Sequence, residues 1–356
     1  MGVYIALLSF ITLFLVAHEK KMHVNISVNQ VNNFKKKRII SQFVIICILG
    51  LFSGTRDGIG IDYSSYLIHI KQISLGYPNY MEFGFRYLSK FVMVFFDDPK
   101  AVIVTISFLT VYFFVSSIYY QSSNVTMSVF LFLTWGYYFF TFNTIRNYFA
   151  LALVFFSLKY IFEKKYLKFI FFVILASLFH KSALVCLPVY LLVNRKFSKS
   201  TYLYLVLGAM LLYLIKAPMR EVAFWIYPVY ENSVYDAGRV SVLNIAKSLL
   251  VLFYGLLYYK IIKDNHKLMV YFNLNAIALI IYTALYWLPE ISRVGFYFNI
   301  VSIVFISNLT TLINVRDQMI AKYIIYSISM ILFVLLMREF YNPTVQLLPY
   351  RSWIFK

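Results

Sequence analysis

The chain has 356 residues, of which 62% are hydrophobic and only 13% are charged. This composition leaves too little polar surface to cover a water-soluble domain of that length, so it excludes a soluble globular protein. A net charge of +19 would suggest nucleic-acid binding in a soluble protein. In a membrane protein, the positions of the basic residues first indicate which loops are cytoplasmic. We therefore predict an all-α polytopic integral membrane protein, with residues 1–356 forming one transmembrane domain and no nucleic-acid partner.

Apolar runs long enough for a bilayer recur along the chain and predict about 10–12 transmembrane helices, some of them short. The first run, residues 4–17, lacks a small-residue cleavage site and precedes a basic loop, so we interpret it as a retained span. Residues 83–96 are expected to form a re-entrant or amphipathic helix that does not cross. Residues 167–193 are predicted to split into two half-length helices around His180.

The polar loops fall into two alternating sets. The first set comprises 18–38, 120–125, 163–168, 194–200, 260–267 and 314–322, and the second comprises 54–99, 143–147, 180–182, 216–240, 288–293 and 338–356. The first set carries 17 basic and 4 acidic residues, against 13 and 10 in the second. By the positive-inside rule the first set is predicted to be cytoplasmic, so the second set and both termini face outward.

Ionisable residues with the strongest functional potential lie in the second set. They are the arginines Arg56, Arg146, Arg239 and Arg293, the carboxylates Asp57, Asp62 and Glu82, and His180. A guanidinium matches phosphate oxygens bidentately, so the arginines suit a phosphate or diphosphate ligand. Histidine titrates near neutrality and suits proton transfer to or from a hydroxyl.

Each of these residues also has a purely structural interpretation. Asp62 and Glu82 precede predicted helices, where a carboxylate stabilises a helix N-terminus. Arg146 would snorkel from a span end to the interface, and His180 would hydrogen-bond a neighbouring helix. Tyr63 and Tyr66 would stack on sugar rings or belong to the aromatic interface belt.

Sequence motifs for several other chemistries are missing. The chain contains no Walker A loop, HExxH, GxSxG, DxD or CxxC pattern. Their absence argues against an ATP-driven transporter and a zinc enzyme, and it predicts no metal site.

Four stretches resemble the EpsG/Wzy-type polysaccharide polymerases of bacterial membranes. They are Thr55-Arg56-Asp57-Gly58-Ile59-Gly60-Ile61-Asp62-Tyr63 with Tyr66, Glu82-Phe83-Gly84-Phe85, Asn143-Thr144-Ile145-Arg146-Asn147, and Leu175-Ala176-Ser177-Leu178-Phe179-His180-Lys181-Ser182-Ala183. The resemblance covers residues 40–193 well, and a family-like core extends over about 40–310. The C-terminal half matches in its pattern of spans and in Arg293. Asn147 stands where the family often has glutamine, which leaves the role of that position open.

The resemblance implies an enzyme of O-antigen (lipopolysaccharide) or exopolysaccharide biosynthesis. Such a glycosyltransferase joins oligosaccharide repeat units carried on undecaprenyl diphosphate, at the outer face of the bacterial cytoplasmic (inner) membrane. It implies that Arg56, Arg146 and Arg293, with Arg239, hold the diphosphate. His180 or one of Asp57, Asp62 and Glu82 would then orient or deprotonate the acceptor. No cofactor is expected. The partners that the resemblance implies are a chain-length regulator and a flippase.

Two other functions remain open. An O-antigen ligase uses the same donor, but the outer loop at 216–240 is short for that class. A flippase or transporter of lipid-linked sugars would also line its cavity with arginines, although it would carry charges through the bilayer midplane. A non-catalytic membrane scaffold would explain the spans but not the polar stretches.

Overall fold

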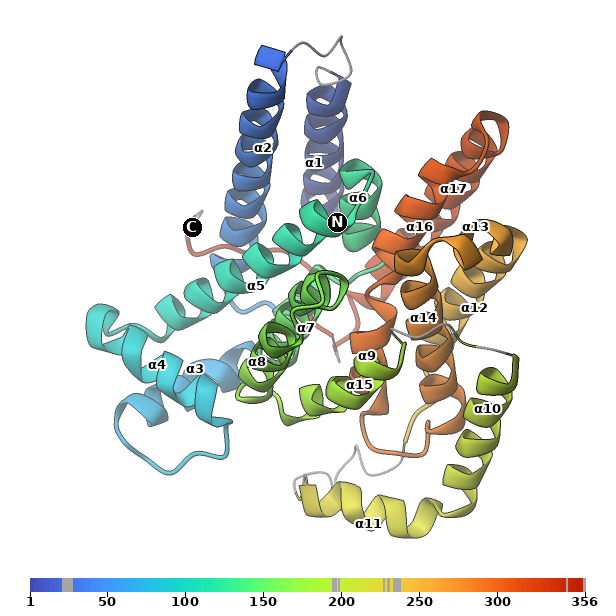
Figure 1. Ribbon diagram of the computed structural model, residues 1–356. Coiled ribbons are helices and arrows are strands. Elements are labelled where there is room, and N and C mark those ends of the chain that lie inside the picture. The colour runs from blue at the N-terminus through green and yellow to red at the C-terminus, as the bar shows by residue number, and fades with distance from the viewer. Residues whose placement is uncertain are drawn as a thin grey trace.

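The computed structural model describes residues 1–20, 28–193, 197, 199–226, 228, 231–232, 238–343 and 345–354, and in these residues the chain is helical without named strands (Figure 1). The helices are α1 (Gly2–Lys20), α2 (Val28–Gly54), α3 (Tyr63–Ser74), α4 (Phe83–Phe96), α5 (Pro99–Gln121), α6 (Val125–Thr134), η1 (Phe139–Phe142), α7 (Ile145–Phe162), α8 (Tyr166–Ser177), η2 (Lys181–Val185), α9 (Cys186–Val193), α10 (Lys199–Leu214), α11 (Lys216–Ile226), α12 (Val242–Leu257), α13 (Tyr259–Asp264), α14 (His266–Ala284), α15 (Ile291–Asn299), α16 (Ser302–Leu312) and α17 (Val315–Glu339). The predicted all-α class is confirmed.

Seven helical segments of the described chain are long and apolar enough to cross a membrane. The helix pair α10 and α11, bent by 80°, would make eight. Four shorter apolar helices of 10–17 residues accompany them. The predicted count of about 10–12 crossings therefore requires the short helices to cross as well.

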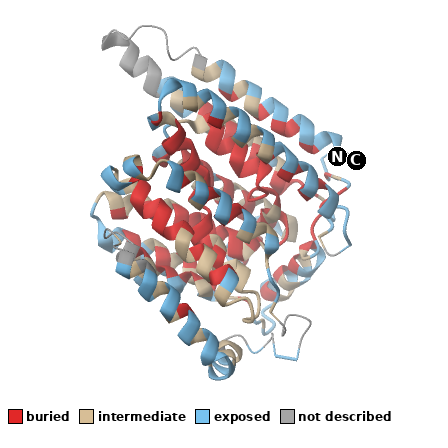
Figure 2. Cartoon of the chain, turned by 90° about the vertical axis from the view of Figure 1, so that its right-hand side faces the viewer, coloured by how far each residue is buried: buried red, intermediate tan, exposed pale blue. Residues whose placement is uncertain are grey.

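The core lies in the central helices, and the outermost helices carry exposed apolar side chains (Figure 2). Residues Ala150 to Phe155 of α7 and Val301 to Phe305 around the start of α16 are almost wholly inaccessible. In contrast, Leu13 on α1, Leu207 on α10 and Ile331 on α17 are exposed. Apolar surface on the outside and polar groups within is the arrangement that a lipid solvent favours.

Several helices begin at a residue whose side chain satisfies an end N–H group. Asp98, Asn124, Asn265 and Asn314 each accept a backbone hydrogen bond at the start of α5, α6, α14 and α17, as N-cap residues do. Pro99 adds the fixed backbone angle that suits a first helical position. These caps set the ends of four helices from short sequence signals.

The two predicted loop sets gather at opposite ends of the helices. His18, Arg38, Asn124 and Lys322, all from the first set, line one cavity. At the other end the loop after α2 contacts the residues before α7, where the Ile61 N–H donates to Asn143 Oδ1 at 3.1 Å. Loop residues 21–27, 194–196 and 233–237, which entered the charge count, lie outside the described residues.

The helix predicted at 83–96 is α4, with these bounds. It forms a hairpin with α3, and both pack against α5 (Figure 1). Phe85 and Val92 face the interior, whereas Phe91 and Phe95 are exposed, so apolar side chains lie on both faces of α4 and its amphipathic character stays a prediction. The predicted split around His180 is also present, because α8 ends at Ser177 and η2 begins at Lys181.

The last described residues fold back onto the loop after α2. The Gly60 N–H donates to the Gln346 carbonyl at 2.8 Å, and the Asp57 N–H donates to the Arg351 carbonyl at 3.0 Å. Gly60 has a φ of +97°, and a Cβ there would lie 2.6 Å from the Phe142 carbonyl oxygen. Only glycine fits this left-handed, crowded turn, which fixes the loop against the start of α7.

Candidate functional site

Glu82 is the centre of a buried charged cluster at the second-set end of the molecule. It occupies the N-cap position of α4, yet its side chain makes no capping hydrogen bond. Its carboxylate instead forms an ion pair with Arg146 and lies 3.4 Å from Nδ1 of His180. The Glu82 side chain is only 8% exposed, so the capping interpretation is wrong and the charge serves the cluster.

Gly84 explains how α4 reaches this position. Its N–H donates to the Leu178 carbonyl at 2.7 Å, and a Cβ there would lie 2.9 Å from the same oxygen. The absence of a side chain lets the start of α4 dock directly against the end of α8. This contact brings Glu82 beside His180, which lies two residues after Leu178.

Arg146 lies in the first turn of α7, with its side chain 19% exposed. A cation at a helix N-terminus faces the positive end of the helix dipole, which is unfavourable. The Glu82 carboxylate offsets that repulsion and the loss of water around the guanidinium. Arg146 is therefore held inward by an ion pair, and the snorkelling interpretation does not apply.

His180 lies in extended backbone between α8 and η2 and is buried. Burial, with Arg293 and Arg146 adding to it, lowers the pKa of His180 to about 3. The imidazole is therefore neutral near pH 7. In the tautomer that places the proton on Nδ1, that nitrogen donates to Glu82 and Nε2 is the basic atom.

Asp62 and Arg293 join the cluster electrostatically. Asp62 occupies the N-cap position of α3 without a capping bond. Burial raises the pKa of Asp62, whereas the positive charges of Arg293 and Arg146 oppose that rise. Arg293 lies in the first turn of α15 and pairs with Glu290 at 2.9 Å. Four sequence segments thus bring their charges to one place.

A cavity of about 320 Å³ adjoins the cluster, which is within the size range of small-ligand sites. Arg293, Glu290 and Ser292 line it beside Asn143 and Thr144 of the segment before α7, and α12 contributes further polar groups. The remaining lining residues are Trp135, Tyr137, Phe140, Tyr148, Ser241, Leu243, Asn244, Lys247 and Phe296. Lys247 and Arg293 outnumber the single carboxylate, Glu290, that pairs with Arg293, so the cavity with its aromatic walls suits an anionic ligand that carries rings.

Arg56 is not part of this site. It is 0% exposed, and its guanidinium donates to the Ser53 carbonyl, Ser107 Oγ (3.3 Å) and the Phe142 carbonyl (3.2 Å). These acceptors engage both terminal nitrogens of the guanidinium. A diphosphate role for Arg56 stays a prediction that this geometry does not favour, since Arg56 holds the loop after α2 against η1.

Tyr63 and Tyr66 are also buried. The Tyr63 ring lies 5.6 Å from the Arg56 guanidinium, and the Tyr66 ring lies 5.7 Å from the Phe85 ring. Both rings pack between α3, α4 and the loop before them, so sugar stacking by these residues stays a prediction that their burial does not favour.

Asp57 and Arg239 lie apart from the cluster. Asp57 pairs with Lys100 at 3.4 Å, near the start of α5. Arg239 is exposed in the segment before α12 and does not line the cavity. A catalytic role for Asp57 and a diphosphate role for Arg239 stay predictions that this geometry does not favour.

Lys247 is the residue that the sequence prediction missed. It is buried within α12, and its Nζ donates to the Trp135 carbonyl at 2.7 Å. The available signal was a single ionisable residue inside the apolar run 242–257, which is costly in a membrane unless it serves a site. In the described residues no three His, Cys, Asp or Glu side chains are grouped to hold a metal ion.

These features define the class of protein: a polytopic α-helical membrane protein with a charged, largely buried site at one end. The family model described as the EpsG family matches residues 39–352. Because this match covers nearly the whole sequence, the chain belongs to the EpsG family. No curated protein and no solved structure matches the chain.

Proposed function

We propose that this chain is a polysaccharide polymerase. It would join oligosaccharide repeat units carried on undecaprenyl diphosphate, at the outer face of the bacterial cytoplasmic membrane. Membership of the EpsG family supports the general activity. The observation that carries the proposal is the convergence of Glu82, Arg146 and His180, from three separate motifs, beside a cavity with two cations.

The outward orientation rests on charge. The first predicted loop set, whose residues His18, Arg38, Asn124 and Lys322 meet at the opposite end, carries most of the basic excess of the sequence, and such loops stay in the cytoplasm. The cluster then faces the compartment in which lipid-linked repeats are displayed.

In the proposed reaction, a hydroxyl of the incoming repeat unit attacks the anomeric carbon of the growing chain. The new carbon–oxygen bond forms as the bond from that carbon to the diphosphate oxygen breaks. Undecaprenyl diphosphate leaves with the electron pair of the broken bond, and the hydroxyl proton passes to the carboxylate of Asp62, whose pKa burial raises, while the neutral His180 orients the hydroxyl. A single displacement of this kind inverts the configuration at the anomeric carbon.

The charged side chains have distinct tasks in this scheme. Arg146 and Arg293 stabilise the negative charge that grows on the leaving diphosphate. Glu82 holds both Arg146 and the imidazole of His180 in position. Asp62, close to both arginines, would take the proton of the acceptor hydroxyl. Since the diphosphate already activates the sugar donor, the scheme needs no nucleotide or metal. Purified protein that loses activity with a chelator and recovers it with a divalent ion would contradict the metal-free scheme.

The test is deletion of the gene in its native host, followed by gel analysis of the surface polysaccharide. Complementing genes would encode wild type, Arg146→Ala and His180→Ala, with Arg316→Ala and His266→Ala as matched controls from the opposite end of the molecule. The proposal predicts a ladder that collapses to single repeats and is restored by wild type and both controls only. Immunoblots of membranes would verify equal protein levels.

Two outcomes would overturn the proposal. An unchanged ladder in the deletion strain would exclude polymerase activity. Complete loss of surface polysaccharide, including single repeats, would favour a ligase or a flippase.

A further inference from the structure

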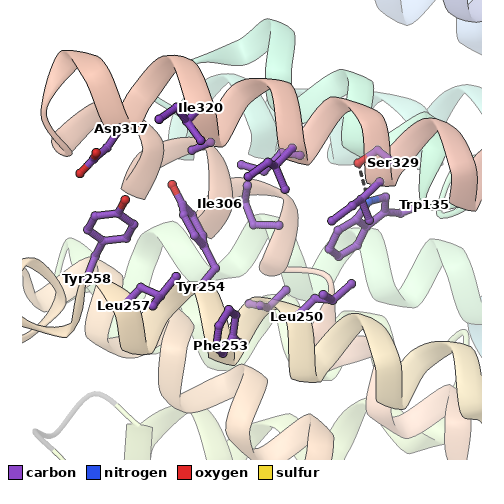
Figure 3. A pocket seen from close by; sticks show the side chains of 15 residues that line it. Trp135, Leu250, Phe253, Tyr254, Leu257, Tyr258, Ile306, Asp317, Ile320 and Ser329 are labelled. Carbon is purple, nitrogen blue, oxygen red and sulfur yellow. Dashed lines mark hydrogen bonds between the residues drawn. The ribbon is translucent and has the colours of Figure 1, made fainter.

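An apolar groove runs between α12 and α17 (Figure 3). It encloses about 340 Å³. Its walls are formed by aliphatic and aromatic side chains of the two helices, among them Leu250, Phe253, Leu257, Ile320 and Ile324. These five side chains are also exposed, so the groove opens sideways, toward the surface that lipid would cover.

The groove meets the charged cavity at Trp135, which lines both. On the groove side, the Trp135 indole N–H donates to Ser329 Oγ at 3.0 Å. On the cavity side, its carbonyl accepts from Lys247 Nζ at 2.7 Å. Helix α12 continues across this junction, because Asn244 and Lys247 line the cavity and Leu250 begins the groove less than one turn later.

The combined shape matches an amphiphile with an anionic head and a single long apolar tail. Lys247 and Arg293 provide cations on the cavity side, whereas the groove follows α17 from Asp317 to Ser329. That stretch of helix is about 18 Å long at 1.5 Å per residue.

We propose that the groove between α12 and α17 holds the part of the isoprenoid chain nearest the head group of a polyprenyl-diphosphate substrate whose diphosphate lies in the charged cavity. This inference rests on the proposed function and deepens it, since it gives the lipid carrier its own subsite. Trp135 is the boundary between the polar and apolar parts of that ligand. Lys247 contacts the head at this boundary.

The test fills the groove without touching the cavity. Ile324 lines the groove and is 52% exposed, whereas Met319, on the same helix and 57% exposed, does not line it. We would compare Ile324→Trp with the matched control Met319→Trp in purified full-length protein in nanodiscs. Binding of undecaprenyl diphosphate would be measured directly, and inorganic diphosphate would serve as a head-only competitor.

Ile324→Trp is expected to weaken undecaprenyl diphosphate binding by about tenfold or more, which corresponds to losing the burial of about two methylene groups. Its affinity for inorganic diphosphate should match that of wild type, which also verifies that the cavity is folded. Met319→Trp should change neither, and Lys247→Met should weaken both.

Three results would overturn the inference. In the first, Ile324→Trp binds undecaprenyl diphosphate as tightly as wild type does. In the second, excess phospholipid displaces undecaprenyl diphosphate. In the third, size-exclusion chromatography shows an altered oligomeric state of Ile324→Trp, which would make the groove an interface between copies. The two proposals fail separately. If the wild-type ladder depends on the gene but Ile324→Trp binds normally, only the groove assignment fails. If Ile324→Trp binds poorly but gene deletion leaves the ladder intact, only the polymerase proposal fails.

Discussion

Replacing Glu82 by glutamine removes one negative charge and leaves the shape of the side chain almost unchanged. The carboxylate is 8% exposed and faces both Arg146 and His180. Removing one partner of a buried ion pair costs about 3–5 kcal/mol, because the other charge stays buried and uncompensated. Arg146 retains 19% exposure, so we expect a loss near the lower end, about 3 kcal/mol of unfolding free energy.

The assay is a double-mutant cycle on the free energy of unfolding in mixed micelles, with Glu82→Gln, Arg146→Gln and the double variant. The double variant should recover more than about 1 kcal/mol relative to the sum of the single changes, since it leaves no unpaired charge. Lys165→Gln is the control, because the Lys165 side chain in its pair with Glu163 is 53% exposed and such pairs contribute about 0–1 kcal/mol. Additive losses at Glu82 and Arg146, or a loss no larger than that of Lys165→Gln, would refute the reasoning.

Three further predictions concern Asp62, Arg56 and His180. Burial raises the pKa of Asp62 above 3.8, so ionisation of this carboxyl destabilises the folded state as the pH rises above that value. Asp62→Asn should therefore raise the melting temperature at pH 7 more than at pH 4. An equal rise at both pH values, or a larger rise at pH 4, would contradict a raised pKa. Arg56→Lys keeps the charge but removes the planar guanidinium that reaches three acceptors. It should therefore lower the free energy of unfolding by about 2 kcal/mol or more. A variant as stable as wild type would make Arg56 a candidate ligand residue again. Burial and the neighbouring arginines lower the pKa of His180 to about 3. The rate of reconstituted polymerisation plotted against pH should therefore show no inflection due to His180 between pH 5 and 8. An inflection near pH 6.5 that disappears in His180→Gln would show that the imidazole titrates there.

The class of fold was predictable because the composition indicates whether the protein surface faces water or lipid. With 62% hydrophobic residues, the chain has to expose apolar side chains, and in a bilayer that requirement leads to helices. The bounds of α4 and the break at His180 also followed from local patterns, since an amphipathic stretch and a polar interruption in an apolar run are readable within one segment.

The site was predictable where its residues interrupt apolar runs, and less so where tertiary contacts decide. Glu82, Arg146 and His180 stood out, and the structure brings them together. Arg56 looked equivalent to Arg146 in sequence, but only the fold shows that residues 53, 107 and 142 surround it. A sequence pattern cannot separate an arginine that meets backbone carbonyls from one that meets a carboxylate.

Lys247 illustrates the opposite error. Its position inside an apolar run indicated a functional role, but its nearest partner, Trp135, is 112 residues away in the sequence. Nothing local links the two. Long-range contacts of this kind determine which of several buried charges share a cavity, and they follow from packing rather than from spacing.

The contact between the two ends of the chain has a consequence for biosynthesis. Ser352 bonds Thr55 across 297 residues, and the Tyr350 hydroxyl donates to the Phe52 carbonyl across 298. At 5–20 residues per second, the loop after α2 waits roughly 15–60 s for these partners to be translated. Throughout that interval this end of the nascent chain stays incomplete and accessible to the insertion machinery and to proteases.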